Sequence, residues 1–331
     1  MDIDAYVEAH AGRWHRLEQL SARRVRSGVE ADELVEGYQE VATHLSVVRS
    51  SAPDAALVSY LSGVLARARS RTTGTTTVTW RDARTFVAAT FPAALYRTRR
   101  WWVSTALVNV AVTAVMTTWL VRHPGAQSAL VTPAQARQLV DEDFAGYYSA
   151  YAPSHFAAQV WTNNAWVAAL CIALGVLGLP VLYLLLQNVS NVAVVGALMI
   201  DHGRGSLFFG LILPHGILEL TAVFVAAGVG LRLCWAWIEP GARTRTQAVA
   251  QEARTAGAVA LGLVLVLLVS GIIEAFVTPS PLPTWARIGI GVAAELLFLA
   301  YALLLGRRAT LAGHSGDVAP GALEDRAATA A

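Results

Sequence analysis

Apolar runs long enough to cross a lipid bilayer fill most of the chain after residue 100. A helix needs about 20 apolar residues to span the hydrocarbon core. Only 15% of the residues are charged, whereas soluble domains carry about 25%. The sequence therefore predicts an all-α, polytopic membrane protein whose residues 101–308 form a transmembrane domain of about six crossings. The run at 189–200 is short, so it either crosses beside its neighbours or re-enters. The predicted crossings are residues 101–121, 161–186, 189–200, 207–238, 256–277 and 286–305.

Residues 1–100 have the pattern of a water-facing helical domain. Tyr6, His10, Trp14 and Leu17 recur at three- and four-residue steps, which places them on one side of a helix. We expect a cytoplasmic helical bundle that ends in a helix at about residues 80–96, where aromatic and basic residues suit a membrane interface. Residues 309–331 are rich in alanine and glycine, and we expect a disordered tail there.

The distribution of arginine predicts the orientation of the crossings, because the chain contains no lysine. Cytoplasmic loops carry an excess of basic residues, so both termini are predicted to be cytoplasmic. The net charge of +2 is too small to indicate nucleic-acid binding. With six crossings, the cytoplasmic face holds Arg97, Arg99, Arg100, Arg243, Arg245, Arg254, Arg307 and Arg308. The opposite face holds Arg122, Arg137, Arg204 and Arg287.

A histidine and several polar or acidic residues fall at membrane depth, where an ionisable side chain is costly and often marks a site. His215 and Glu219 are four residues apart, so they share one side of a helix. Proline favours the first turn of a helix. A crossing that begins at Pro214 would put His215 near the outer surface and Glu219 about 6 Å deeper. The predicted intramembrane site comprises His215, Glu219, Glu274, Asn163, Asn164 and Glu295.

Three interpretations of this predicted site remain open. The residues could fix helix packing through hydrogen bonds between helices. They could instead bind a cation, a proton or a lipid headgroup, since histidine and carboxylates form proton relays. The third interpretation is catalysis by a metal-activated water. His-x-x-x-Glu is only half of a zinc motif, and His-Glu-x-x-His is absent. His202 could add a second histidine. The sequence leaves a metal open and predicts no cofactor.

The chain resembles the stage II sporulation protein M family of bacterial membrane proteins over roughly residues 10–308. The two motifs in the transmembrane region are the more specific ones, and the amino-terminal matches are generic. The matching features are Trp14-x-x-Leu17, Tyr38, Phe91-Pro92, Asn163-Asn164, Pro214-His215-Gly216-x-x-Glu219 and Glu274-Ala275-Phe276-Val277-Thr278-Pro279.

This resemblance implies a location in the inner membrane of a bacterium and a set of protein partners, but no catalytic residues. The founding member of the family works with a peptidoglycan hydrolase and a lytic enzyme as their membrane anchor. Longer relatives are encoded beside MoxR-type ATPases and RDD membrane proteins. We therefore expect a non-enzymatic membrane component or anchor of a cell-envelope complex, in contact with membrane lipids and such protein partners. A small ion or proton channel or transporter is the alternative, and an intramembrane metal-dependent hydrolase is the third. Small residues such as Gly228 and Gly230 permit tight helix contacts, so a homo-oligomer is possible.

Overall fold

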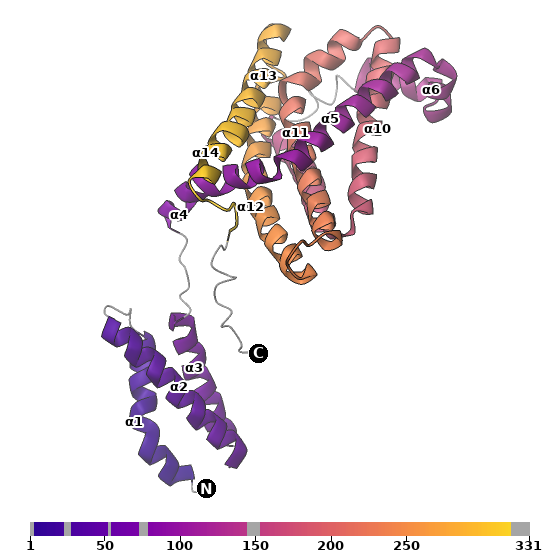
Figure 1. The fold of residues 1–331 in the computed structure, drawn as a ribbon. Helices are drawn as coiled ribbons and strands as arrows, with labels where there is room; N and C mark the ends of the chain where they lie inside the picture. Colours follow the sequence, from indigo (N-terminus) through magenta and orange to yellow (C-terminus); the bar gives the residue numbers. More distant parts are fainter. Residues whose placement is uncertain (1–2, 23–27, 52–53, 73–78, 144–152, 319–331) are drawn as a thin grey trace. The chain divides into compact units, whose positions relative to one another are not determined.

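The computed structural model describes residues 3–22, 28–51, 54–72, 79–143 and 153–318 (Figure 1). These residues are mostly helical, and no strand occurs among them. Their contacts divide the chain into two compact units, Met1–Thr79 and Trp80–Ala331. The predicted fold class, an all-α polytopic membrane protein, is confirmed by the helix content and by the apolar helices described below.

The first unit is a bundle of three helices around its own apolar core. The helices are α1 (Ile3–Ala22), α2 (Gly28–Ser51) and α3 (Ala55–Thr72). Trp14 and Leu17 of α1 pack on Val41 of α2 and Leu61 of α3, and all four side chains are at most 2% exposed. The three- and four-residue periodicity of the apolar positions explains this core, because it gives each helix one apolar side.

Polar groups tie α1 to α2 within this bundle. The Trp14 indole Nε1 donates a hydrogen bond to Nδ1 of the buried His44, at 3.1 Å. The ring of His10 lies 4.1 Å from that of His44, measured between centroids. On the surface, Arg16 makes a two-point ion pair with Glu33, at 2.7 and 2.9 Å. Because an exposed pair of this kind contributes little stability, the buried Trp14–His44 contact is the more consequential polar link.

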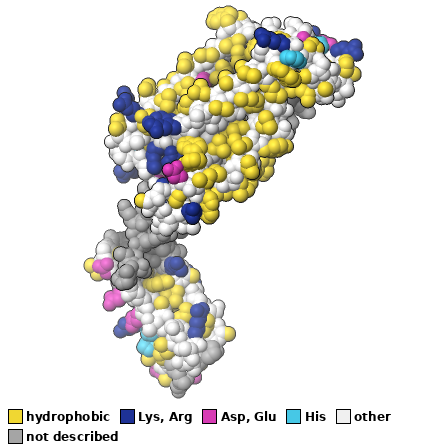
Figure 2. Space-filling model, turned by 45° about the vertical axis from the view of Figure 1, so that its right-hand side comes forward, with side chains coloured by type: hydrophobic (Ala, Val, Ile, Leu, Met, Phe, Trp, Pro, Cys, Tyr) yellow, Lys and Arg dark blue, Asp and Glu magenta, His cyan; other side chains and the backbone are white. Residues whose placement is uncertain are grey.

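Five helices of the second unit, among the described residues, are long and apolar enough to cross a membrane. In Figure 2, hydrophobic side chains cover the visible side of this unit, and arginines gather toward two of its edges. Two of them are single elements, α10 (Leu179–Asp201) and α11 (Gly205–Ile238). The other three join several elements: α4 (Trp80–Thr85), η1 (Phe86–Thr90) and α5 (Phe91–Arg122); α12 (Arg245–Ile272) and η4 (Ile273–Val277); and α13 (Thr284–Ala300), η5 (Tyr301–Leu305) and α14 (Gly306–Leu311). The shorter elements are α6 (Pro124–Leu130), α7 (Pro133–Gln138), η2 (Leu139–Asp143), α9 (Pro153–Ala173) and η3 (Gly175–Leu177).

Helix α11 lies at the centre of the second unit and contacts α5, α9, α10, α12 and α13. Two glycines let neighbouring backbones approach it closely. A Cβ at Gly228 would lie 2.5 Å from Cα of Trp102 in α5, and one at Gly230 would overlap the carbonyl of Cys171 in α9. Helices pack this closely in membranes where small residues line the contact. Both α5 and α9 are therefore held against α11 by backbone proximity.

The structure corrects two of the predicted crossings. The predicted run 161–186 contains a break, because α9 ends at Ala173 and α10 begins at Leu179. Gly178 adopts φ +71° before α10, and Pro180 lies in its first turn. Both residue types favour such a boundary. The predicted short run 189–200 is the second half of α10, whose 23 residues suffice for a crossing. Residues 188–200 therefore lie within one continuous helix rather than in a short separate segment.

The predicted boundary at residue 100 and the predicted tail also differ from the structure. Residues 80–100 belong to the second unit, within one helix that continues to Arg122. Phe91 and Leu95 of this segment are buried rather than spread on an interface, and Phe91 packs against Gly262 of α12. Of the predicted tail, residues 309–311 complete α14 and Asp317 is buried. Residues 319–331 lie outside the described part of the chain.

The bundle should lose stability as the pH falls below about 6.5, the ordinary pKa of histidine. Burial and the neighbouring His10 lower the pKa of His44. The unfolded chain therefore takes up a proton that the folded bundle resists, which favours unfolding in acid. Protonated Nδ1 also cannot accept the Trp14 bond, worth about 1 kcal/mol. That loss lowers Tm by about 4–8 °C in a domain of this size.

Circular-dichroism melts of residues 1–79 on either side of that pH measure this effect. His44→Gln should remove the part of the pH dependence that comes from His44. His15→Gln, at an exposed position, should leave it unchanged. Equal melting temperatures of the wild type at both pH values would contradict the prediction.

Candidate functional site

Helix α11 carries two of the predicted site residues deep into the second unit. His215 is 4% exposed and Glu219 is 8% exposed. The helix runs unbroken from Gly205 to Ile238, close to the predicted run 207–238, with Pro214 in its interior. The supposed helix start at Pro214, which placed His215 near the outer surface, is therefore not what the structure has. His215 lies ten residues along the helix, about 15 Å from its start at 1.5 Å per residue. The site is therefore deeper relative to the end of α11 than predicted.

Close helix packing surrounds the interior proline. Proline in a helix removes one backbone hydrogen bond and crowds the preceding turn, and membrane helices tolerate it where neighbours compensate. Gly291 of α13 lies so close to the Pro214 carbonyl that a Cβ there would overlap it. Ser270 of α12 donates a hydrogen bond to the carbonyl of His215, at 2.9 Å. Neighbouring helices thus fix this turn of α11 from two sides.

Glu274 reaches the site from a widened turn at the end of α12. Residues 273–277 (η4) form a π-helical turn, in which the Thr278 N–H donates to the carbonyl of Ile273 at 3.1 Å. Such turns are rare and frequently occur at functional sites. Glu274 is 2% exposed and Thr278 is fully buried. Arg287 of α13 donates to the Thr278 carbonyl, at 2.5 Å, which ties the loop after the turn to α13.

The structure brings His215, Glu219 and Glu274 together into one buried group. One nitrogen or oxygen atom from each lies within 4.8 Å of those of the other two. His215 Nε2 is 3.5 Å from Glu274 Oε1. On the other side of the ring, His215 Nδ1 is 3.1 Å from Thr278 Oγ1. Within the described residues, no hydrogen-bond donor reaches Glu219 Oε1 or Glu274 Oε2.

The other three predicted site residues have different surroundings. Asn164 of α9 lies beside Glu219 and so borders the group. Asn163, one position earlier, is exposed. Glu295 accepts a hydrogen bond from Thr221 at 3.0 Å, on the α13 side of α11, and does not belong to the three-residue group. His202 contacts the Leu198 carbonyl at the end of α10, so the suggested second histidine is not part of the group either.

An imidazole and two carboxylates in a buried space can hold a positive charge. Two ionised carboxylates close together repel each other, so one takes a proton or a cation lies between them. The same residue types are the usual components of proton relays in membranes. They are also ligands for divalent metals such as zinc. The group can therefore retain a proton or a metal ion.

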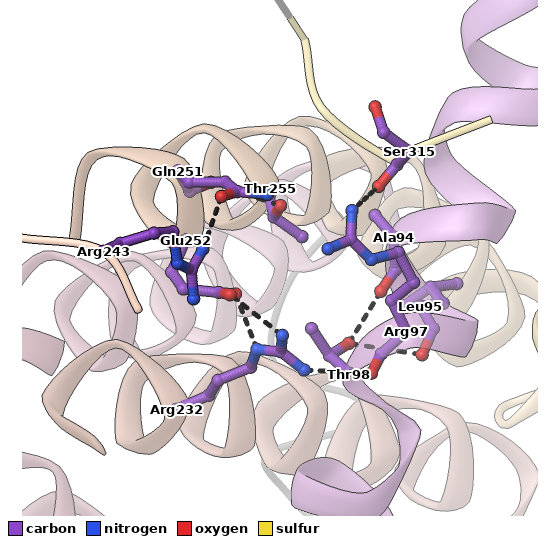
Figure 3. Close-up of polar contacts among 10 residues, drawn as sticks. All are labelled: Ala94, Leu95, Arg97, Thr98, Arg232, Arg243, Gln251, Glu252, Thr255 and Ser315. Atoms are coloured by element: carbon purple, nitrogen blue, oxygen red, sulfur yellow. Dashed lines mark hydrogen bonds and ion pairs between the residues drawn. The ribbon is translucent and has the colours of Figure 1, made fainter. Parts of the chain in front are cut away.

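Sequence reasoning missed a second polar cluster, at the other end of α11 (Figure 3). Arg232 of α11 makes a two-point ion pair with Glu252 of α12, at 2.6 and 2.9 Å, and donates to the Arg97 carbonyl of α5 at 3.0 Å. Arg254 pairs with Asp317, at 2.8 Å. The sequence did hold a signal for this ion pair: Arg232 is a lone arginine in an apolar run, and Glu252 lies near the start of the next helix. These charges have partners, which distinguishes the cluster from the His215 group.

Two family models match separate parts of the chain. Residues 106–279 match Stage II sporulation protein M, and residues 4–74 match a domain of unknown function (DUF8413). Neither a curated protein nor a solved structure matches the chain. The first match covers more than half of the 331 residues and includes His215, Glu219 and Glu274. The chain therefore belongs to the stage II sporulation protein M family of membrane proteins.

Proposed function

We propose that this protein is a non-enzymatic component or anchor of a bacterial cell-envelope complex, whose amino-terminal bundle binds cytoplasmic partners. The division of the chain after Thr79 is the observation that carries the proposal. The bundle buries its own apolar residues among its three helices, so it needs no packing against the membrane unit to form a core. It also matches a family model of its own. A membrane unit joined to an independent helical unit suits an anchor.

The family resemblance supplies the candidate partners. These are peptidoglycan hydrolases, or MoxR-type ATPases together with RDD membrane proteins. The bundle surface carries acidic and basic side chains, such as Arg13, Arg16 and Glu33. Polar surfaces of this kind suit reversible binding to another soluble domain, because transient interfaces are more polar than permanent ones. We assign partner binding on this basis to residues 3–72.

The proposed orientation places both termini in the cytoplasm of a bacterium. In the second unit, α14 packs against the first part of α5, where Gly306 abuts Pro92, and Figure 1 draws these elements together. The start of the first apolar helix and the end of the last one thus lie on the same side of the unit, as an even number of crossings requires. We take α9 as the sixth crossing. The excess of arginine at the α14 side supports a cytoplasmic location for that side.

Cysteine labelling tests this orientation. In a background with Cys171→Ala and Cys234→Ala, Ser128→Cys should react with a membrane-impermeant maleimide in intact cells. Ala242→Cys should react only after lysis. Both positions are exposed in the structure, so access depends on the side of the membrane. The reverse pattern would contradict the proposed orientation, and labelling of both positions in intact cells would contradict an arrangement with these loops on opposite sides.

Capture of partners from native membranes tests the anchor proposal. The full chain, cross-linked in cells and purified, should bring down envelope proteins that residues 80–331 alone do not. Trp14→Ala, which removes a fully packed core side chain and costs about 3–5 kcal/mol, should reproduce the deletion. Val29→Ser, at a position 78% exposed, is the matched control and should keep the partners. An unchanged set of captured proteins after deletion of the bundle would refute the role assigned to it.

A second candidate function, a cation or proton pathway, is favoured by the buried carboxylates of the His215 group. Glu219 and Glu274 each have a carboxylate oxygen without a hydrogen-bond partner among the described residues. Ionisable groups inside a membrane unit cost free energy, and they often mark a pathway or a binding site. If this candidate is right, proteoliposomes should show a cation or proton flux, and Glu219→Gln should reduce the rate of that flux at least about tenfold. Glu295→Gln, which changes a glutamate outside the group, should leave the flux intact. The absence of flux in wild-type liposomes would exclude this function and leave the anchor proposal in place.

A further inference from the structure

The His215 group has the spacing of a metal-binding site. Donor atoms from α11 and from the π-helical turn of α12 lie within 4.8 Å of one another. A tetrahedral zinc ion with ligand distances of about 2.0–2.2 Å has neighbouring ligands about 3.3–3.5 Å apart. The 3.5 Å between His215 Nε2 and Glu274 Oε1 matches that separation. The Glu219 carboxylate would need only a small side-chain movement to complete the set.

Two buried oxygen atoms in this group have no hydrogen-bond partner among the described residues. They are Glu219 Oε1 and Glu274 Oε2, and their residues are 8% and 2% exposed. A buried carboxylate oxygen without a donor or a cation is strongly unfavourable. In contrast, the buried Glu252 at the other end of α11 has both oxygens bonded to Arg232. Among the described residues, no arginine pairs with Glu219 or Glu274 as Arg232 does with Glu252, and the basic side chain beside Glu274 is His215.

The surroundings orient the His215 ring as a metal ligand. Histidines that bind metals usually donate their other ring N–H to a nearby acceptor, which fixes the tautomer. Here Thr278 Oγ1 lies 3.1 Å from Nδ1, and Nε2 faces Glu274. The hydrogen bond from Ser270 to the His215 carbonyl holds the backbone at this position. Asn164 lies beside the Glu219 carboxylate.

We propose that His215, Glu219 and Glu274 together bind one divalent first-row transition metal ion, most suitably zinc. One imidazole and two carboxylates suit zinc and its neighbours in the series, whereas magnesium and calcium prefer oxygen ligands alone. Three protein ligands leave the fourth tetrahedral position for a water molecule. The ion would also link α11 to α12 inside the membrane unit. This inference does not depend on the proposed anchor function.

Metal analysis of the purified full chain, without a histidine tag, is the first test. After equilibration with buffered zinc and removal of the excess, the wild type should retain zinc in a one-to-one ratio. His215→Ala and Glu274→Gln should lose it. Glu295→Gln, with its glutamate replaced outside the group, should retain it. Zinc that remains in all three variants, or a folded wild type that takes up none, overturns the proposal.

A second measurement keeps the test valid if a variant folds poorly. Zinc should raise the Tm of the wild type in detergent in proportion to the logarithm of its concentration, and a chelator should reverse the shift. Thr278→Val, which removes the hydroxyl beside Nδ1 but no metal ligand, should weaken zinc binding by about 10–100-fold. Thr310→Val is its control on α14. Two negative results together would refute the metal site: a wild-type Tm that does not respond to zinc, and no visible absorption from added cobalt. In that case the carboxylates share protons instead of binding a metal ion.

Discussion

The close approach of neighbouring helix backbones to α11 is the constraint on which the membrane unit depends. No hydrophobic force draws helices together within lipid, so association relies on dispersion contacts and on hydrogen bonds between helices. Gly228 and Gly230 remove the side chains that would hold α5 and α9 away, and Gly291 does the same for α13 at Pro214. Five helices can therefore surround α11. A buried central helix in turn allows ionisable residues at its middle, because other helices rather than lipid surround them.

The polar residues of the membrane unit form two groups of different chemical character. At the α14 side, Arg232 and Glu252 form a two-point ion pair, and Arg232 also donates a hydrogen bond to the Arg97 carbonyl of α5. This arrangement fixes three helices through charge-assisted hydrogen bonds. In the His215 group, one histidine lies close to two glutamates, and within the described residues each glutamate has one oxygen without a hydrogen-bond donor. The first group is complete as a structural link, whereas the second has buried carboxylate oxygens that the proposed metal ion would contact.

Long apolar runs and helical periodicity predicted the fold class and the bundle core correctly, because both depend on burial repeated over many residues. Trp14 and Leu17, placed on one side of a helix by their spacing, are core residues. The boundaries depend on single residues and were harder to predict. Gly178 and Pro180 end one helix and begin another inside a continuous apolar run. Pro214, by contrast, lies inside α11 because neighbouring helices compensate for it. Sequence alone does not tell these two environments apart.

The candidate site was predictable in part for the same reason. His215 and Glu219 had to share a helix side, and Glu274 could reach them from the end of a neighbouring helix. The π-helical turn, which gives Glu274 its position, has no signal in the residue types of 273–277. Asn163 and Asn164 show the limit most clearly. Adjacent residues on a helix point about 100° apart, so only one of them could face the group. The structure selects Asn164, beside Glu219, and leaves Asn163 exposed. Which of two adjacent polar residues belongs to a site depends on the rotation of α9 about its own axis, and that rotation is a result of packing against α11 and α12 that the residue types do not reveal.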